Sequence, residues 1–225
     1  MIPDPTENIW EHSQSLRELY GRRARGEAEM DAAAQAAEIL APFIRSAAAA
    51  PRLLDAGCGS GYLFHSFKKR NLAVEYYGLD YSPSLIEIGR AILPAHGLPA
   101  ERLTCGAIED LRDRRFDLVA LVNCLTFCPD FRAPLDRLML CEPARIVIRD
   151  NFGPETVISW ETDGYLDPGF NHLKAYWNRW SVAEVTDFLA RGGYRSVLLE
   201  DRRVKGQAEM VVGKPYYWAW LAAER

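Results

Sequence analysis

Cysteine and histidine are both scarce in this sequence, which has five cysteines and four histidines among its 225 residues. The number of cysteines is odd, no pair is spaced Cys-x-x-Cys, and no histidine stands at metal-ligand spacing from any of them. A disulfide framework or a structural metal site would need such patterns. We therefore expect no metal, and a reduced chain that works in the cytoplasm. The cysteines are Cys58, Cys105, Cys124, Cys128 and Cys141.

Long hydrophobic runs and an excess of positive charge are also missing. The longest apolar stretch, Leu118 to Cys128, is too short to cross a bilayer, and the segment Met1 to Trp10 is acidic and contains proline, unlike a secretory signal. The 27 lysines and arginines stand against 31 acidic residues, a net charge of −4, with the two signs interspersed. No broad cationic face is left for a phosphate backbone, which disfavours a nucleic-acid partner. No membrane partner is expected either.

Hydrophobic residues make up 48% of the chain, enough for one domain with a sizeable core. After Pro51, short apolar runs alternate with segments that have helical period or helix-start signals. This alternation is typical of a parallel sheet with crossover helices. The apolar runs are Leu53–Ala56, Val74–Leu79, Leu103–Cys105, Phe116–Val122 and Ile146–Ile148.

Capping signals place two helices. Ser82 followed by Pro83 predicts a helix that begins there and runs to about residue 93. Ser181 and Glu184 form a capping box, and the helix that follows should end at the glycine pair 192–193.

The two ends of the chain complete the predicted elements. Helical pieces are expected around Ile9–Arg25 and from Glu27 to about Ala49, where apolar residues recur on one helical face. Strands are expected over Ser196–Leu199 and Val211–Leu221, the second of them pairing antiparallel with its neighbour.

A glycine-rich turn follows the first apolar run. It reads DAGCGSG over residues 55–61, with three glycines at every second position before a helix expected near Tyr62. Such a turn lets the backbone approach a ligand closely. A dinucleotide fingerprint would need its third glycine at position 62, and a phosphate-binding loop would need a lysine after glycine, so both of these motifs fail on spacing.

Asp80 ends the second apolar run, so it should lie on the same rim of the sheet as the glycine turn. A carboxylate in that place can accept hydrogen bonds from both hydroxyls of a ribose. Taken alone, an aspartate at a strand end is more often a helix cap than a ligand group. Together, the order and spacing of the turn and Asp80 favour a nucleoside-binding site.

Three segments together resemble the class I S-adenosylmethionine-dependent methyltransferase family: residues 53–62, residues 78–83 (GLDYSP) and residues 116–119 (FDLV). The similarity covers roughly residues 51–150. It implies an α/β, Rossmann-like sheet of seven mostly parallel strands in the order 3-2-1-4-5-7-6, with the last strand antiparallel and helices on both faces. It also implies S-adenosylmethionine as cofactor and S-adenosylhomocysteine as product.

The resemblance organises the chain as one methyltransferase domain over residues 1–225. Residues 1–50 would form an N-terminal helical cap and residues 51–150 the cofactor-binding half. Residues 151–180 would form an aromatic insertion or lid, followed by a C-terminal helix and strands over residues 181–225.

The resemblance also implies which residues hold the cofactor. The glycine turn would lie beside the methionine moiety, Asp80 on the ribose hydroxyls, and Asp55 would order the turn. In many relatives an N-terminal segment contacts the cofactor carboxylate, although an arginine-rich helix end is as often simply solvated. The implied set is Asp55, Gly57, Cys58, Gly59, Gly61, Asp80, Tyr81, Ala107, Ile108, Val122 and Asn123, with Tyr20 and Arg25 from the N-terminal segment.

The sequence departs from the family in two places. Ala107 replaces the aspartate that usually faces adenine, so adenine would be held by apolar contact and backbone groups. Thr126 and Phe127 stand where the family commonly has histidines. A general base from that loop is therefore not expected.

The segment 151–179 is rich in aromatic residues and breaks the alternation of strands and helices. Such an insertion is a lid or a substrate wall. Its rings could stack on an acceptor or form the apolar underside of a lid. Candidate substrate-binding residues are Trp160, Tyr165, Tyr176 and Trp177.

Two residues are candidate general bases for a hydroxyl acceptor, Asp150 at the end of the fifth strand and His172 in the insertion. An aspartate before Asn151 can instead cap a turn, and a single histidine is usually structural.

The resemblance implies methyl transfer to oxygen or nitrogen of a small molecule, such as a sugar or a secondary metabolite. A protein or RNA acceptor is the alternative, against which stands Asn-Cys-Leu-Thr at residues 123–126 in place of an Asn-Pro-Pro-Tyr tetrapeptide. A subunit that binds the cofactor without turnover is a third hypothesis. The sequence leaves a homo-oligomer open.

Overall fold

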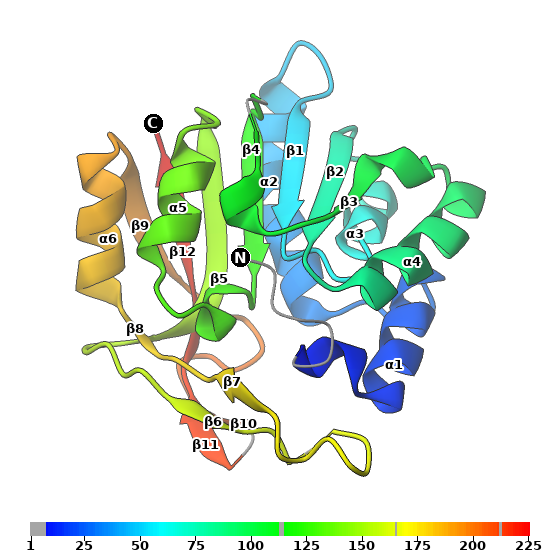
Figure 1. Cartoon of the computed structure of the whole chain (residues 1–225). Helices are drawn as coiled ribbons and strands as arrows, with labels where there is room; N and C mark the ends of the chain where they lie inside the picture. Colours follow the sequence, from blue (N-terminus) through cyan, green and yellow to red (C-terminus); the bar gives the residue numbers. More distant parts are fainter. Residues whose placement is uncertain (1–7, 113–114, 165, 212) are drawn as a thin grey trace.

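The computed structural model describes residues 8–112, 115–164, 166–211 and 213–225 (Figure 1). Its centre is a mostly parallel sheet. The strands follow one another across it in the order β3 (Leu103–Cys105), β2 (Glu75–Asp80), β1 (Arg52–Ala56), β4 (Leu118–Val122), β5 (Arg145–Gly153), β12 (Trp218–Glu224) and β9 (Arg195–Glu200). Strand β12 is antiparallel to both of its neighbours. Since β9 and β12 are the sixth and seventh main strands along the chain, the predicted order 3-2-1-4-5-7-6 is confirmed.

Helices cover both faces of the sheet, as expected. Successive residues of a strand point to opposite faces, so Leu53 and Leu54 of β1 belong to two different apolar cores. One core packs under α2 (Asp31–Ser46), α3 (Leu63–Lys69) and α4 (Pro83–Ile92), and the other under α5 (Arg132–Met139) and α6 (Val182–Arg191).

The predicted helix caps are present at α4 and α6. The Ser82 hydroxyl accepts from the Leu85 amide, and the Ser181 hydroxyl accepts from the Glu184 amide, each at 3.4 Å. The return half of the capping box is missing, because the Glu184 carboxylate pairs with Arg132 at 3.3 Å.

The N-terminal cap is smaller than predicted. It consists of the short 3-10 helix η1 (Ile9–Glu11) and α1 (Gln14–Ala24), which packs on α4. Helix α2 was expected to belong to the cap, but its apolar face, with Ala37 and Leu40, is buried against the sheet. The apolar face of α2 gains most free energy where it buries the largest apolar surface. That surface is the face of the sheet.

Two hairpins lie beyond the carboxyl edge of the sheet, below it in Figure 1. The aromatic insertion forms β6 (Trp160–Thr162) and β7 (Lys174–Tyr176), followed by the short β8 (Trp180–Ser181). The second hairpin is β10 (Glu209–Val211) with β11 (Lys214–Tyr216). The single strand predicted over Val211–Leu221 is therefore wrong. Gly213, with φ of +73°, reverses the chain inside that span.

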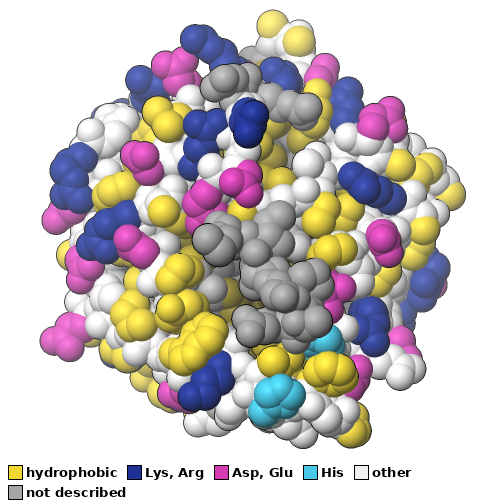
Figure 2. Space-filling view, in the orientation of Figure 1, with side chains coloured by type: hydrophobic (Ala, Val, Ile, Leu, Met, Phe, Trp, Pro, Cys, Tyr) yellow, Lys and Arg dark blue, Asp and Glu magenta, His cyan; other side chains and the backbone are white. Residues whose placement is uncertain are grey.

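The remaining connections contain short 3-10 helices: η2 (Leu93–His96), η3 (Ala100–Arg102), η4 (Ile108–Asp110) and η5 (Leu125–Phe127). Of the helices that the structure describes, none combines the length and apolar character that a membrane span requires. Basic and acidic side chains are interspersed on the face shown in Figure 2.

Candidate functional site

Two adjoining cavities lie at the carboxyl edge of the parallel strands. The smaller has a volume of about 270 Å³ and the larger of about 490 Å³. The sheet forms one side of both, and the N-terminal cap and the hairpins contribute the other. Six described residues line both cavities: Ile9, Gly57, Asp80, Tyr81, Cys124 and Phe127.

The glycine turn is held against the end of β2. The amides of Gly57 and Cys58 both donate to the Leu79 carbonyl, at 2.8 and 3.1 Å. Gly57 has φ of +76°, and a Cβ there would lie 2.7 Å from the Cys124 sulfur. Only glycine therefore lets the chain turn this tightly beside the cavities.

The other residues of the turn serve its packing. Gly59 also has a positive φ, +56°, but a Cβ on it would overlap the ring of Tyr20 rather than project into a cavity. Gly61 faces Leu103 in the core, and Cys58 is buried. Of the predicted turn residues Gly57 lines the cavities, while Cys58, Gly59 and Gly61 do not.

Asp80 lies at the junction of the two cavities. One carboxylate oxygen accepts from the Gly59 amide at 2.7 Å, and the other accepts from the Ser82 amide at 2.9 Å. Burial raises the pKa of Asp80 to about 6, although both amides favour the charged form. Each carboxylate oxygen can accept a second hydrogen bond, so the group retains acceptor capacity toward the cavities.

Asp55 is buried one layer below the cavities and lines neither of them. It accepts a hydrogen bond from the Tyr76 hydroxyl on the adjacent strand. Burial, with a smaller effect from the charge of Asp80, raises the pKa of Asp55 to about 7. The position agrees with a residue that supports the turn from beneath.

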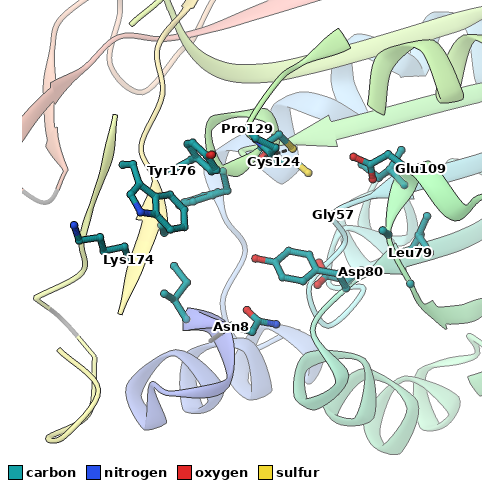
Figure 3. Close-up of a pocket in the computed structure, with 18 residues that line it drawn as sticks. Asn8, Gly57, Leu79, Asp80, Glu109, Cys124, Pro129, Lys174 and Tyr176 are labelled. Atoms are coloured by element: carbon teal, nitrogen blue, oxygen red, sulfur yellow. Dashed lines mark hydrogen bonds between the residues drawn. The ribbon is translucent and has the colours of Figure 1, made fainter. Parts of the chain in front are cut away.

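The smaller cavity is lined mostly by apolar groups, among them Leu79, Ala107 and Ile108. Its charged lining residues are Asp80, Glu109 and Lys174. In Figure 3, Tyr176 borders the side opposite Asp80. Asn8 also lines this cavity. Its amide oxygen accepts from the Trp10 amide at 3.1 Å, and its buried amide nitrogen has no partner among the described residues.

An arginine of the N-terminal cap lies at the larger cavity, but it is Arg23 rather than the predicted Arg25. The Arg23 guanidinium lies 5.3 Å from the ring centre of Tyr20 and 5.1 Å from that of Tyr62. Arg25 pairs with Glu27 at 2.6 Å and lines neither cavity. Residues two positions apart at a helix end point to different sides, which separates these two arginines. Tyr20 lines the larger cavity, as expected.

Aromatic rings line both cavities. Trp160 and Tyr176 of the first hairpin lie in the smaller one, with ring centres 4.5 Å apart. The larger cavity has Trp177, whose ring centre is 5.2 Å from that of Phe127. Tyr165, the fourth predicted aromatic residue, lies outside the described residues. Trp10, Tyr62 and Trp218 also contribute aromatic rings to the larger cavity.

The two predicted general bases lie outside the cavities. Asp150 is fully buried and accepts from the Asn151 amide at 2.8 Å. Burial raises the pKa of Asp150 to about 6, while the amides of Asn151, Thr126 and Leu125 favour its charged form. His172 is exposed. Neither residue lines a cavity, so the geometry supports a base at neither position.

Asn123 ends strand β4 and lines the larger cavity next to Val122. It has φ of +58°, and its amide N–H donates to the Arg149 carbonyl at 2.8 Å. Its side-chain oxygen accepts from the Arg149 guanidinium. Arg149 in turn pairs with Asp201 at 2.6 Å, and both side chains are 2% exposed.

Several cavity residues were not predicted from the sequence. Asn8 and Trp10 belong to a 3-10 helix too short to show a period, and Asp163 follows a three-residue strand. Arg149 lines neither cavity but supports Asn123 from behind, and it did carry a signal, because a charged residue directly follows the apolar run of a buried strand.

Comparisons with known proteins agree with this architecture. A family model described as a methyltransferase domain matches residues 54–141. A release factor glutamine methyltransferase of Geobacter sulfurreducens is 29% identical over 175 residues, which are 78% of this chain and 53% of that protein. The chain thus spans about half the length of the curated relative it matches.

Solved structures extend the similarity to almost the whole chain. Magnesium protoporphyrin IX methyltransferase from Synechocystis, with bound S-adenosylmethionine, is 16% identical with a TM-score of 0.60, covering 96% of this chain and 93% of that one. An S-adenosylmethionine-dependent methyltransferase from Clostridium acetobutylicum is 14% identical with a TM-score of 0.61, covering 93% and 97%. Residues 54–141 therefore match a methyltransferase domain, and the sheet order is that of the class I S-adenosylmethionine-dependent methyltransferase fold.

Proposed function

We propose that this protein transfers a methyl group from S-adenosylmethionine to a small-molecule acceptor. The observation that carries the proposal is the pair of adjoining cavities. One is a largely apolar slot whose lining includes the buried carboxylate of Asp80, as a nucleoside requires, and the other offers aromatic walls to a second molecule. Gly57, Asp80 and Tyr81 line both, so the two ligands would meet there.

The residues present fit the cofactor. Leu79, Ala107 and Ile108 would hold adenine by apolar contact, and the free lone pairs of Asp80 would accept from the ribose hydroxyls. The unpartnered amide nitrogen of Asn8 is buried beside this slot, where leaving a donor unsatisfied costs about 1–3 kcal/mol. A nucleoside oxygen or ring nitrogen would satisfy it.

Arg23 fits the remaining charge of the cofactor. Its guanidinium lies at the larger cavity, and the residues that the structure describes include no carboxylate in an ion pair with it. The methionine carboxylate would supply that partner. Val122 and Asn123 would border the methionine part from the end of β4.

The cofactor supplies a methyl group on a sulfonium, which is an excellent leaving group. What remains for the chain is to orient the acceptor and to exclude water. The N-terminal cap serves the second task, since Glu11 accepts a hydrogen bond from Ser82 and the Gln14 amide donates to Asp167 at 3.0 Å. These contacts hold the cap to α4 and to the insertion.

A thermal melt tests the cofactor assignment. Ligand at about a hundred times its Kd adds roughly 2.7 kcal/mol to the free energy of unfolding, which is on the order of 5 to 10 °C in melting temperature for a chain of this length. S-Adenosylmethionine and S-adenosylhomocysteine should both raise the melting temperature, and NAD should not. No shift with either sulfur compound would refute the proposal.

The alternatives differ in what happens after binding. A protein or RNA methyltransferase would bind the cofactor equally well but label a macromolecule when the methyl group is tritiated. A non-catalytic subunit would show the melting shift and label nothing. The enclosure of the larger cavity by the cap and both hairpins favours a small acceptor.

A further inference from the structure

The larger cavity presents an amide nitrogen, not an amide oxygen, at the end of strand β4. A guanidinium carries only N–H donors, so the hydrogen bond from Arg149 identifies the atom of Asn123 that it meets as the oxygen. The Asn123 amide nitrogen is then left toward the cavity, and it has no hydrogen-bond partner among the described residues.

This orientation is held from several sides. The Asn123 backbone is fixed to the Arg149 carbonyl, and the Asn123 side chain is fixed to the Arg149 guanidinium. Asp201 anchors the guanidinium. Burial raises the pKa of Asp201, but Arg149 and the amides of Val204 and Arg203 together lower it further, so the pKa lies below its usual value and the pair is ionised. The guanidinium also lies 4.4 Å from the ring centre of Trp218. A turned amide would place its N–H groups against a fixed cation.

A hydrogen-bond donor beside the reacting centre discriminates between nucleophiles. A neutral amine has a single lone pair, and a hydrogen bond from Asn123 would occupy the pair that must attack the methyl carbon. An ionised oxygen has three lone pairs, so it can accept from Asn123 with one and attack with another. Charge-assisted hydrogen bonds of this kind are also stronger than neutral ones.

We propose that the methylated atom is an ionised oxygen, that of a carboxylate on a flat apolar body, held by the amide nitrogen of Asn123. This rests on the proposed function. A carboxyl group with a pKa of about 4 has already lost its proton to water at neutral pH, so no general base is needed. It forms the new carbon–oxygen bond with one of its lone pairs, and the carbon–sulfur bond breaks with its electrons on sulfur. The flat body follows from the rings of Trp10, Phe127 and Trp177, and the preference for a charged oxygen follows from the amide N–H groups of Asn123.

Arg149 and Asp201 are positioning residues in this scheme, because they act through Asn123.

The test compares three probes of matched shape: 2-naphthoate, 2-naphthol and 2-naphthylamine. Each is titrated calorimetrically into protein saturated with S-adenosylhomocysteine at pH 8, where the naphthoate is ionised and the naphthol and the amine are neutral. We expect the naphthoate to bind at least about tenfold more tightly than the amine, with naphthol between them. Equal binding of naphthoate and amine, tighter binding of the amine, or no binding of the naphthoate overturns the proposal. Failure of S-adenosylhomocysteine to bind would instead refute the proposed function.

Variants assign the preference to Asn123. Asn123→Asp replaces the donor by an acceptor of the same shape, so naphthoate affinity should fall about tenfold or more while amine affinity does not fall. Asn71→Asp is the matched control, since Asn71 also has a left-handed backbone, φ of +52°, and lines neither cavity. Arg149→Lys, which keeps the charge but not the fork of donors, should bring the naphthoate-to-amine ratio toward one. An unchanged ratio in Asn123→Asp overturns the proposal even if Arg149→Lys does not fold.

Discussion

Asp80 accepts hydrogen bonds from the amides of Gly59 and Ser82 and also lines both cavities. A test of its role in ligand binding therefore needs a conservative substitution that keeps these backbone contacts. Asp80→Asn keeps one oxygen for an amide contact and loses the charge and one acceptor. We expect S-adenosylhomocysteine affinity to fall by about 1.5 to 3 kcal/mol, the range for charge-assisted hydrogen bonds. Calorimetric titration of the folded variant measures it.

The control for Asp80→Asn is Asp187→Asn, an exposed aspartate on α6 that lines neither cavity. Its cofactor affinity should equal that of the native protein. If Asp80→Asn also binds as the native protein does, Asp80 does not contact the ribose and serves only the two loops.

Residue type alone predicted part of this site. Gly57, Asp80 and Asn123 follow apolar runs, and the carboxyl ends of parallel strands share one edge, so their proximity was predictable. The role of Gly59 was not, because it depends on the ring of Tyr20, which lies on another element. The choice between Arg23 and Arg25 likewise depends on how α1 sits on α4, which no local pattern encodes.

At the scale of elements, two helix caps allow a matched comparison. Ser82 and Ser181 both accept from the amide three residues on, so replacing either by alanine should cost about 1 kcal/mol, or about 2 to 4 °C in melting temperature. Only Ser82 also donates to Glu11 of η1, which closes over the cavities. Ser82→Ala should therefore weaken S-adenosylhomocysteine binding as well, and Ser181→Ala should not.

Equal cofactor affinity in the two cap variants would show that the hydrogen bond from Ser82 to Glu11 does not hold the N-terminal cap closed. A melting temperature that falls in neither variant would contradict both cap assignments. Differential scanning fluorimetry with and without ligand gives both quantities from the same samples.

Elements with a strong period or a clear cap were predictable, and short ones were not. Apolar runs predicted the positions of strands β1, β4 and β5 correctly. Capping signals predicted where helices α4 and α6 begin. The hairpins β6–β7 and β10–β11 have strands of only three residues, which carry no measurable alternation. These hairpins cover the cavities, so the covering elements were the least predictable part of the fold.

For the whole molecule, the resemblance covered about residues 51–150 and the fold extends beyond them at both ends. The order of all seven main strands was implied by the family and is confirmed. The assignment of α2 to a cap was wrong, because a sequence shows that a helix has an apolar face but not which surface covers it.

The free energy of unfolding of the whole molecule depends on pH. Three buried carboxyl groups all change it in the same direction. Burial raises the pKa of Asp55 to about 7 and those of Asp80 and Asp150 to about 6, above the value near 4 expected in the unfolded chain. Between about pH 4 and pH 7 the folded protein then binds more protons at these groups than the unfolded chain. Their contribution to the free energy of unfolding therefore decreases as the pH rises through that window.

A single substitution isolates this effect from the other titrating groups. Asp55→Asn cannot titrate but keeps an oxygen to accept from Tyr76, so it avoids the cost of burying a charge at high pH. The melting temperature of Asp55→Asn minus that of the native protein should increase as the pH is raised from 5 to 8. The same difference for Asp187→Asn should stay constant. A difference for Asp55→Asn that is flat or falls would mean that Asp55 is ionised in the folded protein throughout this range, and that Tyr76 and the glycine turn stabilise its charge.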